Sequence, residues 1–189
     1  MTDERLTIWT IGHSTRSVAE LVDLLGQVSI NLLVDIRSIP RSRTNPQFNI
    51  DALPVALAPS GIGYRHLPAL GGLRGRRKDG AASPNTLWRS VAFRNYADYA
   101  GSVPVFRQGL DELTALATDN RVAIMCAEAV WWRCHRRIVS DYLLLAGVTV
   151  SHILGAGKIE PATLTPGARP LPDGTILYPA PAEAQLPLL

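Results

Sequence analysis

The stretch that decides the fold is LTIWTIGHSTRSVAELVDLLGQVSINLLVDIR, residues 6–37. Residues 6–11 form a β-branched and aromatic run that stops at Gly12, which predicts a strand. Ser17 and Glu20 then make a capping-box pattern ahead of apolar residues at helical spacing, so a helix follows. Residues 32–37 are apolar on both faces and end in charge, as is typical of a strand buried between helix layers. This order predicts a βαβ unit with parallel strands.

The rest of the chain continues the alternation of strands and helices. The pattern predicts a third strand at 61–67, helices at 87–99 and 105–117, a fourth strand at 122–126, a helix at 132–146 and a fifth strand at 148–154. We therefore expect one α/β domain over residues 1–154, with a mostly parallel five-stranded sheet, helices on both faces and Rossmann-like layering. The tail, residues 155–189, is irregular and rich in Pro and Gly. We expect it to pack on or extend from the same domain, with a hairpin turn at 172–174.

The composition is that of an ordinary globular chain of 189 residues, with 47% hydrophobic and 19% charged residues. No stretch approaches eighteen consecutive apolar residues, which argues against a membrane span. The first residues carry acids and lack a signal-peptide pattern, so we expect a cytoplasmic protein. In that reducing compartment the 2 cysteines favour free thiols or metal ligands over a structural disulfide.

Arginine dominates the positive charge of this chain. The formal net charge is +3, and lysine occurs only at positions 78 and 158. Two clusters fall in predicted loops, one at Arg37, Arg41 and Arg43 and the other at residues 74–77. The planar arginine fork suits bidentate binding of phosphate or carboxylate. The alternative is that these are solvated loop arginines.

Every predicted strand ends in residues able to bind, titrate or attack. In strand order these are His13 and Ser14, then Asp35 and Arg37, then His66, then Cys126 and Glu128, and finally His152. The carboxyl ends of parallel strands meet at one edge of a sheet, so we expect a site there. Each group has a structural alternative. Asp35 and Arg37 could form an ion pair, His13 could cap a helix, and His152 could be a core residue.

The densest cluster is MCAEAVWWRCHRR, residues 125–137. Cys126 and Glu128 project to the same side of an extended strand, so Cys126 is a candidate nucleophile or soft metal ligand, or else a small buried hydrophobe. Cys134 shares a helix face with Ile138, and we expect it to pack. We expect the arginines of the first helical turn, at positions 133, 136 and 137, to face solvent, where a bound anion would explain them.

Several blocks of sequence, in order, resemble a known family. They are TIGHS (10–14), VDIRSIPRSR (34–43), YRHLPALGG (64–72), MCAE (125–128) with CHR (134–136), and HI (152–153). The chain resembles, over about residues 7–154, the bacterial and archaeal family catalogued as domain of unknown function 488. The resemblance implies a single α/β domain with a site built from these blocks, and it supplies no activity. The segment AVWWR, residues 129–133, departs from the proline-containing turn expected in relatives.

Our first functional hypothesis is an enzyme or binding protein for a phosphate-bearing substrate, either a nucleotide or a nucleic acid. The expected catalytic residues are Cys126, Glu128, Asp35 and His13. The expected substrate-binding residues are Ser14, Arg37, Arg41, Arg43, Tyr64, His66, His135 and Arg136. No phosphate loop, dinucleotide fingerprint or Ser-His-Asp arrangement is present, so the sequence does not define a reaction type.

Two further hypotheses use the same residues. One is a divalent-metal site: Cys126, Glu128, His13, His135 and Cys134 are all metal-capable, and Cys126, Glu128 and His135 are the favoured set, although no CxxC or HxxxH spacing supports it. The other is a non-catalytic redox-sensing or interaction module in which Cys126 and Cys134 form a reversible thiol pair.

Overall fold

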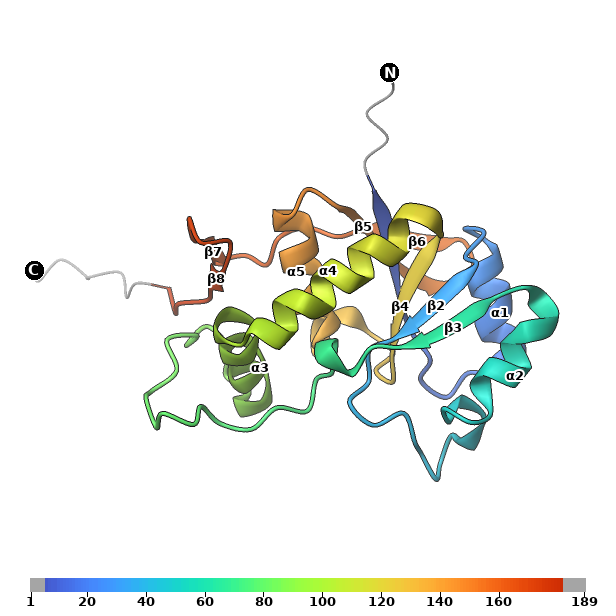
Figure 1. The fold of residues 1–189 in the computed structure, drawn as a ribbon, viewed down its shortest axis with the longest axis horizontal. Coiled ribbons are helices and arrows are strands. Elements are labelled where there is room, and N and C mark those ends of the chain that lie inside the picture. Colours follow the sequence, from blue (N-terminus) through green and yellow to red (C-terminus); the bar gives the residue numbers. More distant parts are fainter. Residues whose placement is uncertain (1–5, 182–189) are drawn as a thin grey trace, which may run out of the picture.

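Six strands form the central sheet of this protein, in the order β3-β2-β4-β1-β5-β6 (Figure 1). The structure is a computed structural model, and it describes residues 6–181. The strands are β1 (Thr7–Gly12), β2 (Leu32–Asp35), β3 (Gly63–His66), β4 (Val122–Cys126), β5 (Thr149–Gly155) and β6 (Lys158–Pro161). Strands β1 to β5 pair in parallel, and β6 pairs antiparallel with β5. The predicted α/β fold with a mostly parallel sheet is confirmed.

Helices cover both faces of the sheet, also as expected (Figure 1). They are α1 (Val18–Gly26), α2 (Leu53–Leu57), α3 (Val91–Ser102), α4 (Pro104–Asp119) and α5 (Arg136–Leu145). Apolar residues of α1 and α2 pack with Leu33 and Ala123 on one face. Apolar residues of α3, α4 and α5 pack with Val34 and Ile124 on the other. Successive residues of β2 and β4 thus alternate between two apolar cores, which explains why these strands are apolar on both sides.

The sheet has one strand more than the five expected. Residues 158–161 of the tail turn back after Gly157, whose φ is 65°, and pair with β5. The expected hairpin also forms, with β7 (Arg169–Pro170) and β8 (Ile176–Leu177) joined through Gly174. Beyond it, Tyr178 is fully buried and donates a hydrogen bond to Asp141 of α5. The tail therefore packs on the α/β domain, while the boundary at residue 154 stays a prediction.

The segment after β4 departs from the expected helix at 132–146. Residues Trp131–Arg133 form a separate 3₁₀ turn, and Cys134 then has extended backbone with φ −126° and ψ 149°. Helix α5 consequently begins at Arg136. The loop from residue 127 to residue 135 therefore crosses the carboxyl edge of the sheet before the helix starts.

None of the helices in the described part of the chain is long and apolar enough to cross a membrane. The expected cytoplasmic location stays a prediction.

Candidate functional site

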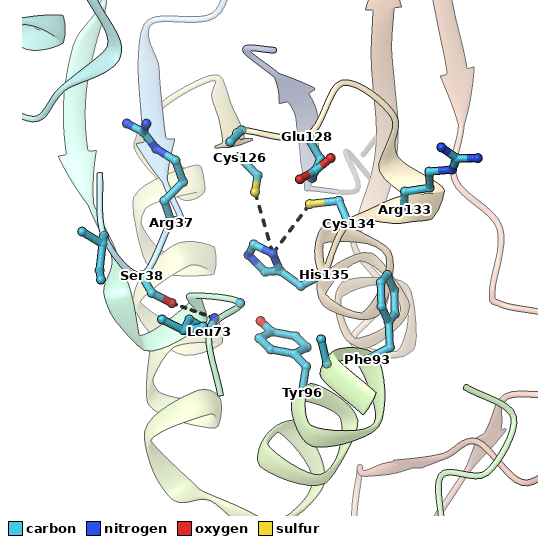
Figure 2. A pocket seen from close by; sticks show the side chains of 14 residues that line it. Arg37, Ser38, Leu73, Phe93, Tyr96, Cys126, Glu128, Arg133, Cys134 and His135 are labelled. Carbon is cyan, nitrogen blue, oxygen red and sulfur yellow. Dashed lines mark hydrogen bonds between the residues drawn. The ribbon is translucent and has the colours of Figure 1, made fainter. Parts of the chain in front are cut away.

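A pocket of about 380 Å³ opens where β4 ends at the carboxyl edge of the sheet (Figure 2). Five segments line it: the residues after β2, the glycine-containing loop at 72–73, the start of α3, the residues after β4 and the residues before α5. Three of the lining side chains, Cys126, Cys134 and His135, point toward one another in Figure 2.

These three side chains bring two sulfurs and one imidazole nitrogen together. The Cys126 Sγ lies 3.8 Å from the His135 Nδ1, and the Cys134 Sγ lies 3.6 Å from the same nitrogen. All three atoms lie within 4.8 Å of one another. Both cysteines are buried and neither is in a disulfide, and His135 is half-buried. The fold therefore assembles a compact set of soft donor atoms.

The orientation of His135 is fixed from outside this cluster. Its Nε2 lies 3.2 Å from the backbone oxygen of Ile36. Because a carbonyl oxygen only accepts, Nε2 carries a hydrogen, and Nδ1 is the ring nitrogen that faces the two sulfurs. The backbone of Gly72 also lies against this ring, so a Cβ at position 72 would sit 2.4 Å from Nδ1. Only glycine fits there without moving the histidine.

The two thiols are in different electrostatic surroundings. Burial raises the pKa of Cys134, but hydrogen bonds from Cys126 and His135 and the charge of Arg136 outweigh it and hold this pKa well below its usual range. The backbone N–H and the Nε of Arg136 both donate to the Cys134 Sγ, each at 3.4 Å. The hydrogen bond with Cys134 and burial raise the pKa of Cys126. Cys134 is therefore the first of the pair to become a thiolate.

Arg136 was expected on the solvent side of α5, and this expectation is wrong. Its side chain is 1% exposed, because α5 begins at this residue and its first turn faces the sheet. Its guanidinium donates to the backbone oxygen of Glu128 at 2.6 Å and to Thr10 Oγ1 at 3.5 Å. It makes no ion pair with any carboxylate in residues 6–181. Of its expected neighbours, Arg137 binds Thr165, and Arg133 is exposed at the pocket.

Asp35 and Arg37 form the buried ion pair that was the structural alternative. The closest oxygen and nitrogen are 2.5 Å apart, and Tyr64 donates its hydroxyl hydrogen to the same carboxylate at 2.7 Å. Arg37 NH1 also donates to the His13 Nε2 at 3.2 Å. Burial lowers the pKa of His13 to about 4, so its ring is neutral. Arg37 lines the pocket, whereas Asp35, His13 and Tyr64 lie outside the pocket lining.

The other expected substrate-binding residues lie away from the pocket. Arg41 is 62% exposed and pairs with Asp51, and Arg43 is exposed as well. Ser14 occupies the turn after β1 with a φ of 48°. The Nε2 of His66 donates to the backbone oxygen of Arg37 at 2.8 Å. The structure therefore does not gather the arginine cluster at positions 37, 41 and 43 into one anion site.

His152 was expected at a strand end, and this placement is wrong. It lies in the middle of β5, where its Nδ1 is 2.8 Å from Thr10 Oγ1 and its ring stacks on Trp131 at 4.4 Å. It is a core histidine, as the alternative held. Burial lowers its pKa to about 4.

Of the expected metal set, Cys126 and His135 lie together in the cluster, and Glu128 is not part of it. Cys134 supplies the third atom of the cluster, although we favoured a packing role for it. Glu128 lines the pocket with an exposed side chain that makes no hydrogen bond with residues 6–181. Figure 2 shows its carboxylate on the side of the pocket where the sulfurs lie.

Sequence analysis also missed Gly72, Phe93 and Tyr96 as pocket residues. Gly72 lies inside a block shared with the resembled family, and that was the available signal. The two aromatic residues sit in an ordinary amphipathic helix, where nothing distinguishes them from core residues.

One comparison with known proteins gave a match. The model of the family described as "Domain of unknown function DUF488" matches residues 17–143, more than half of the chain. The matched range contains Cys126, Cys134 and His135. No curated protein and no solved structure matches the chain.

Proposed function

The chain belongs to the DUF488 family, whose description assigns no activity, and we propose from the site itself that the protein binds a soft divalent metal ion, with Zn²⁺ as the first candidate. The ligands are Cys126, Cys134 and His135. One coordination position is left for a ligand that enters through the pocket.

The spacing of the ligand atoms carries this proposal. A tetrahedral zinc ion has bonds of about 2.3 Å to sulfur and about 2.0 Å to imidazole nitrogen, which places a sulfur and a nitrogen about 3.5 Å apart. The two sulfur–nitrogen distances in this protein are 3.6 and 3.8 Å. Thiolate and imidazole donors favour zinc over magnesium or calcium.

The groups around the ligands support the same function. The hydrogen bond from His135 Nε2 to the Ile36 oxygen is the outer contact that metal-binding histidines usually make. The two donors of Arg136 stabilise Cys134 as a thiolate, which is the form that binds metal. The fold itself makes these contacts, and they hold the His135 ring and the Cys134 sulfur in the positions that the proposed ion requires.

Three protein ligands beside a pocket are typical of a catalytic site rather than a structural one, which has four. A bound zinc ion would polarise a ligand or lower the pKa of a bound water. Glu128, whose carboxylate is unpaired among the described residues, is placed in the pocket wall to accept a proton.

The sequence-based expectation of a phosphate-bearing substrate has weaker support. Arg37 binds Asp35, Arg136 binds backbone and sulfur, and Arg41 and Arg43 lie outside the pocket lining. Arg133 is the exposed guanidinium that remains at the pocket. Nucleotide or nucleic-acid binding therefore stays a prediction. The redox-sensing module also stays a prediction, and we favour metal binding over it because His135 adds a third donor atom beside the two thiols.

Elemental analysis of protein purified without a tag or added metal tests the proposal. We expect about one zinc per wild-type chain and a loss of most of it in Cys134→Ala and His135→Ala. His66→Ala is the matched control, since this histidine binds a backbone oxygen outside the cluster, and it should keep its metal. Stoichiometric zinc in Cys134→Ala would refute the assignment.

A further inference from the structure

The charge around the triad indicates what kind of ligand completes the site. Two thiolates neutralise a divalent ion. Arg136 is then left as a buried cation beside them, because within residues 6–181 its guanidinium contacts only uncharged acceptors and the Cys134 sulfur. A buried net positive charge is unfavourable unless an anion joins it. The metal-loaded site therefore favours an anion at its open position.

The wall of the pocket indicates what the rest of this ligand looks like. Ile39 and Leu73 line the pocket and are 64% and 74% exposed, so their apolar surface is unpartnered in residues 6–181. Phe93 lies on the opposite side of the pocket in Figure 2. Tyr96 lies beneath this wall, 1% exposed, with its hydroxyl donating to the Leu70 oxygen. An apolar body of a small molecule would cover these side chains.

The available donors favour a carboxylate over a phosphate as the anionic group. Phosphate sites usually supply several charged or backbone donors. Two arginines line the pocket, and Arg37 is paired with Asp35. The guanidinium of the other, Arg133, makes no hydrogen bond or ion pair with residues 6–181. Glu128 in the same lining carries one negative charge that offsets Arg133, so the buried Arg136 leaves one positive charge at the metal-loaded pocket, and one monoanion matches it.

We propose that the pocket binds a small monoanion with an apolar body, an aryl- or alkyl-substituted carboxylate, with its head at the metal and its body against Leu73 and Phe93. This inference rests on the proposed metal site. It adds to that site the chemical class of the ligand that the pocket takes.

Cobalt-loaded full-length protein provides the test, because a Co²⁺ ion bound by thiolates absorbs in the near ultraviolet and visible, and its spectrum changes with the fourth ligand. We would titrate it with 3-phenylpropanoate, acetate and inorganic phosphate. We expect 3-phenylpropanoate to reach half-saturation at a concentration at least about tenfold below that of acetate, because binding buries its phenyl group against the apolar wall of the pocket. Phosphate should leave the spectrum unchanged over that range.

Three exposed positions give matched variants. Leu73→Ser should remove most of the preference for 3-phenylpropanoate over acetate. Arg133→Gln should weaken both acids by a similar factor of up to about five. Val55→Ser, at a valine of α2 that is 74% exposed and outside the pocket lining, should change neither titration.

The outcomes separate the two proposals. Absence of thiolate-to-cobalt absorption would refute the metal site itself. Normal absorption with equal half-saturation by acetate and 3-phenylpropanoate, or with tighter binding of phosphate, would leave the metal site standing and overturn the inference about its ligand.

Discussion

Arg136 shows how much a single residue contributes to this site. Its buried guanidinium joins the Cys134 sulfur, the Glu128 carbonyl and Thr10, residues from three different segments. It therefore stabilises both the loop after β4 and the thiolate form of Cys134.

We expect Arg136→Gln to lower the free energy of unfolding by about 1–3 kcal/mol, because buried acceptors lose their donor. Zinc affinity should fall with it. Arg133→Gln removes an exposed arginine of the same loop and should change stability by less than about 0.5 kcal/mol. Urea unfolding of both variants, with zinc removed by a chelator, checks this. Equal stability of the two variants would contradict the role given to Arg136.

Two buried histidines predict a stability that depends on pH. Burial lowers the pKa of His13 and of His152 from 6.5 to about 4. Their neutral rings thus contribute full stability above pH 6.5, and this stability is lost as the pH falls from 6.5 toward 4. At pH 5 the loss is up to about 2 kcal/mol for each group.

Urea unfolding of metal-free protein at pH 7 and pH 5 measures this loss. His152→Gln should reduce the difference in the free energy of unfolding between pH 7 and pH 5, since only one of the two buried histidines then titrates. A difference that stays the same in this variant would show that His152 does not cause it.

Residue types alone led us to favour Cys126 and His135 for the site and to favour packing for Cys134. Its spacing from Ile138 is that of a packing residue in a continuous helix. The 3₁₀ turn Trp131–Arg133 and the extended backbone at Cys134 instead aim its sulfur at His135. Such a local break has no clear signature in the sequence, because Trp-Trp-Arg is compatible with helix.

At the scale of elements, the loop at 71–73 is as important as the segment after β4. Gly71 approaches Ser38, and Gly72 lies against the His135 ring. This loop therefore connects the residues after β2 with those before α5 and holds the imidazole in place.

Gly72→Ala should displace His135 and lower zinc affinity by at least about tenfold, because the new Cβ would lie 2.4 Å from Nδ1. Gly75→Ala is the matched control in the same loop, since nothing lies within 4 Å of its Cβ position. Competition with a chromophoric zinc chelator measures both affinities. Unchanged affinity in Gly72→Ala would mean that the loop does not position the ligand.

The elements themselves were largely predictable, since β1, α1, β2 and β4 follow clear apolar periodicity. The sequence did not predict which residues of the strands lie at the carboxyl edge of the sheet. His152 was grouped with the strand ends although the fifth strand was expected to run to residue 154, and in the structure it lies inside β5 and in the core. Strand length depends on pairing with β1 and β6, which a single segment does not reveal.

At the scale of the whole molecule, the tail completes the core. Ile176 and Tyr178 are buried against the helices, Tyr178 binds Asp141, and the Thr165 backbone N–H binds the same carboxylate. The tail thus satisfies a buried acid and covers apolar surface on the α3–α5 side of the sheet.

A chain ending at residue 154 should therefore be insoluble or unfold at a lower temperature than the full chain, since it loses β6 and leaves Asp141 buried without these donors. A chain ending at residue 181 keeps all these contacts and serves as the control. Calorimetry of both checks this. Equal unfolding temperatures for the 1–154 and 1–181 chains would show that the tail is dispensable.

The central claim is that Cys126, Cys134 and His135 bind one metal ion with an open position toward the pocket. X-ray absorption spectroscopy at the zinc edge of the zinc-loaded full chain tests it most directly. The account predicts two sulfur neighbours at about 2.3 Å and two nitrogen or oxygen neighbours at about 2.0 Å, one of them the imidazole. A first shell of nitrogen and oxygen atoms without sulfur would contradict it.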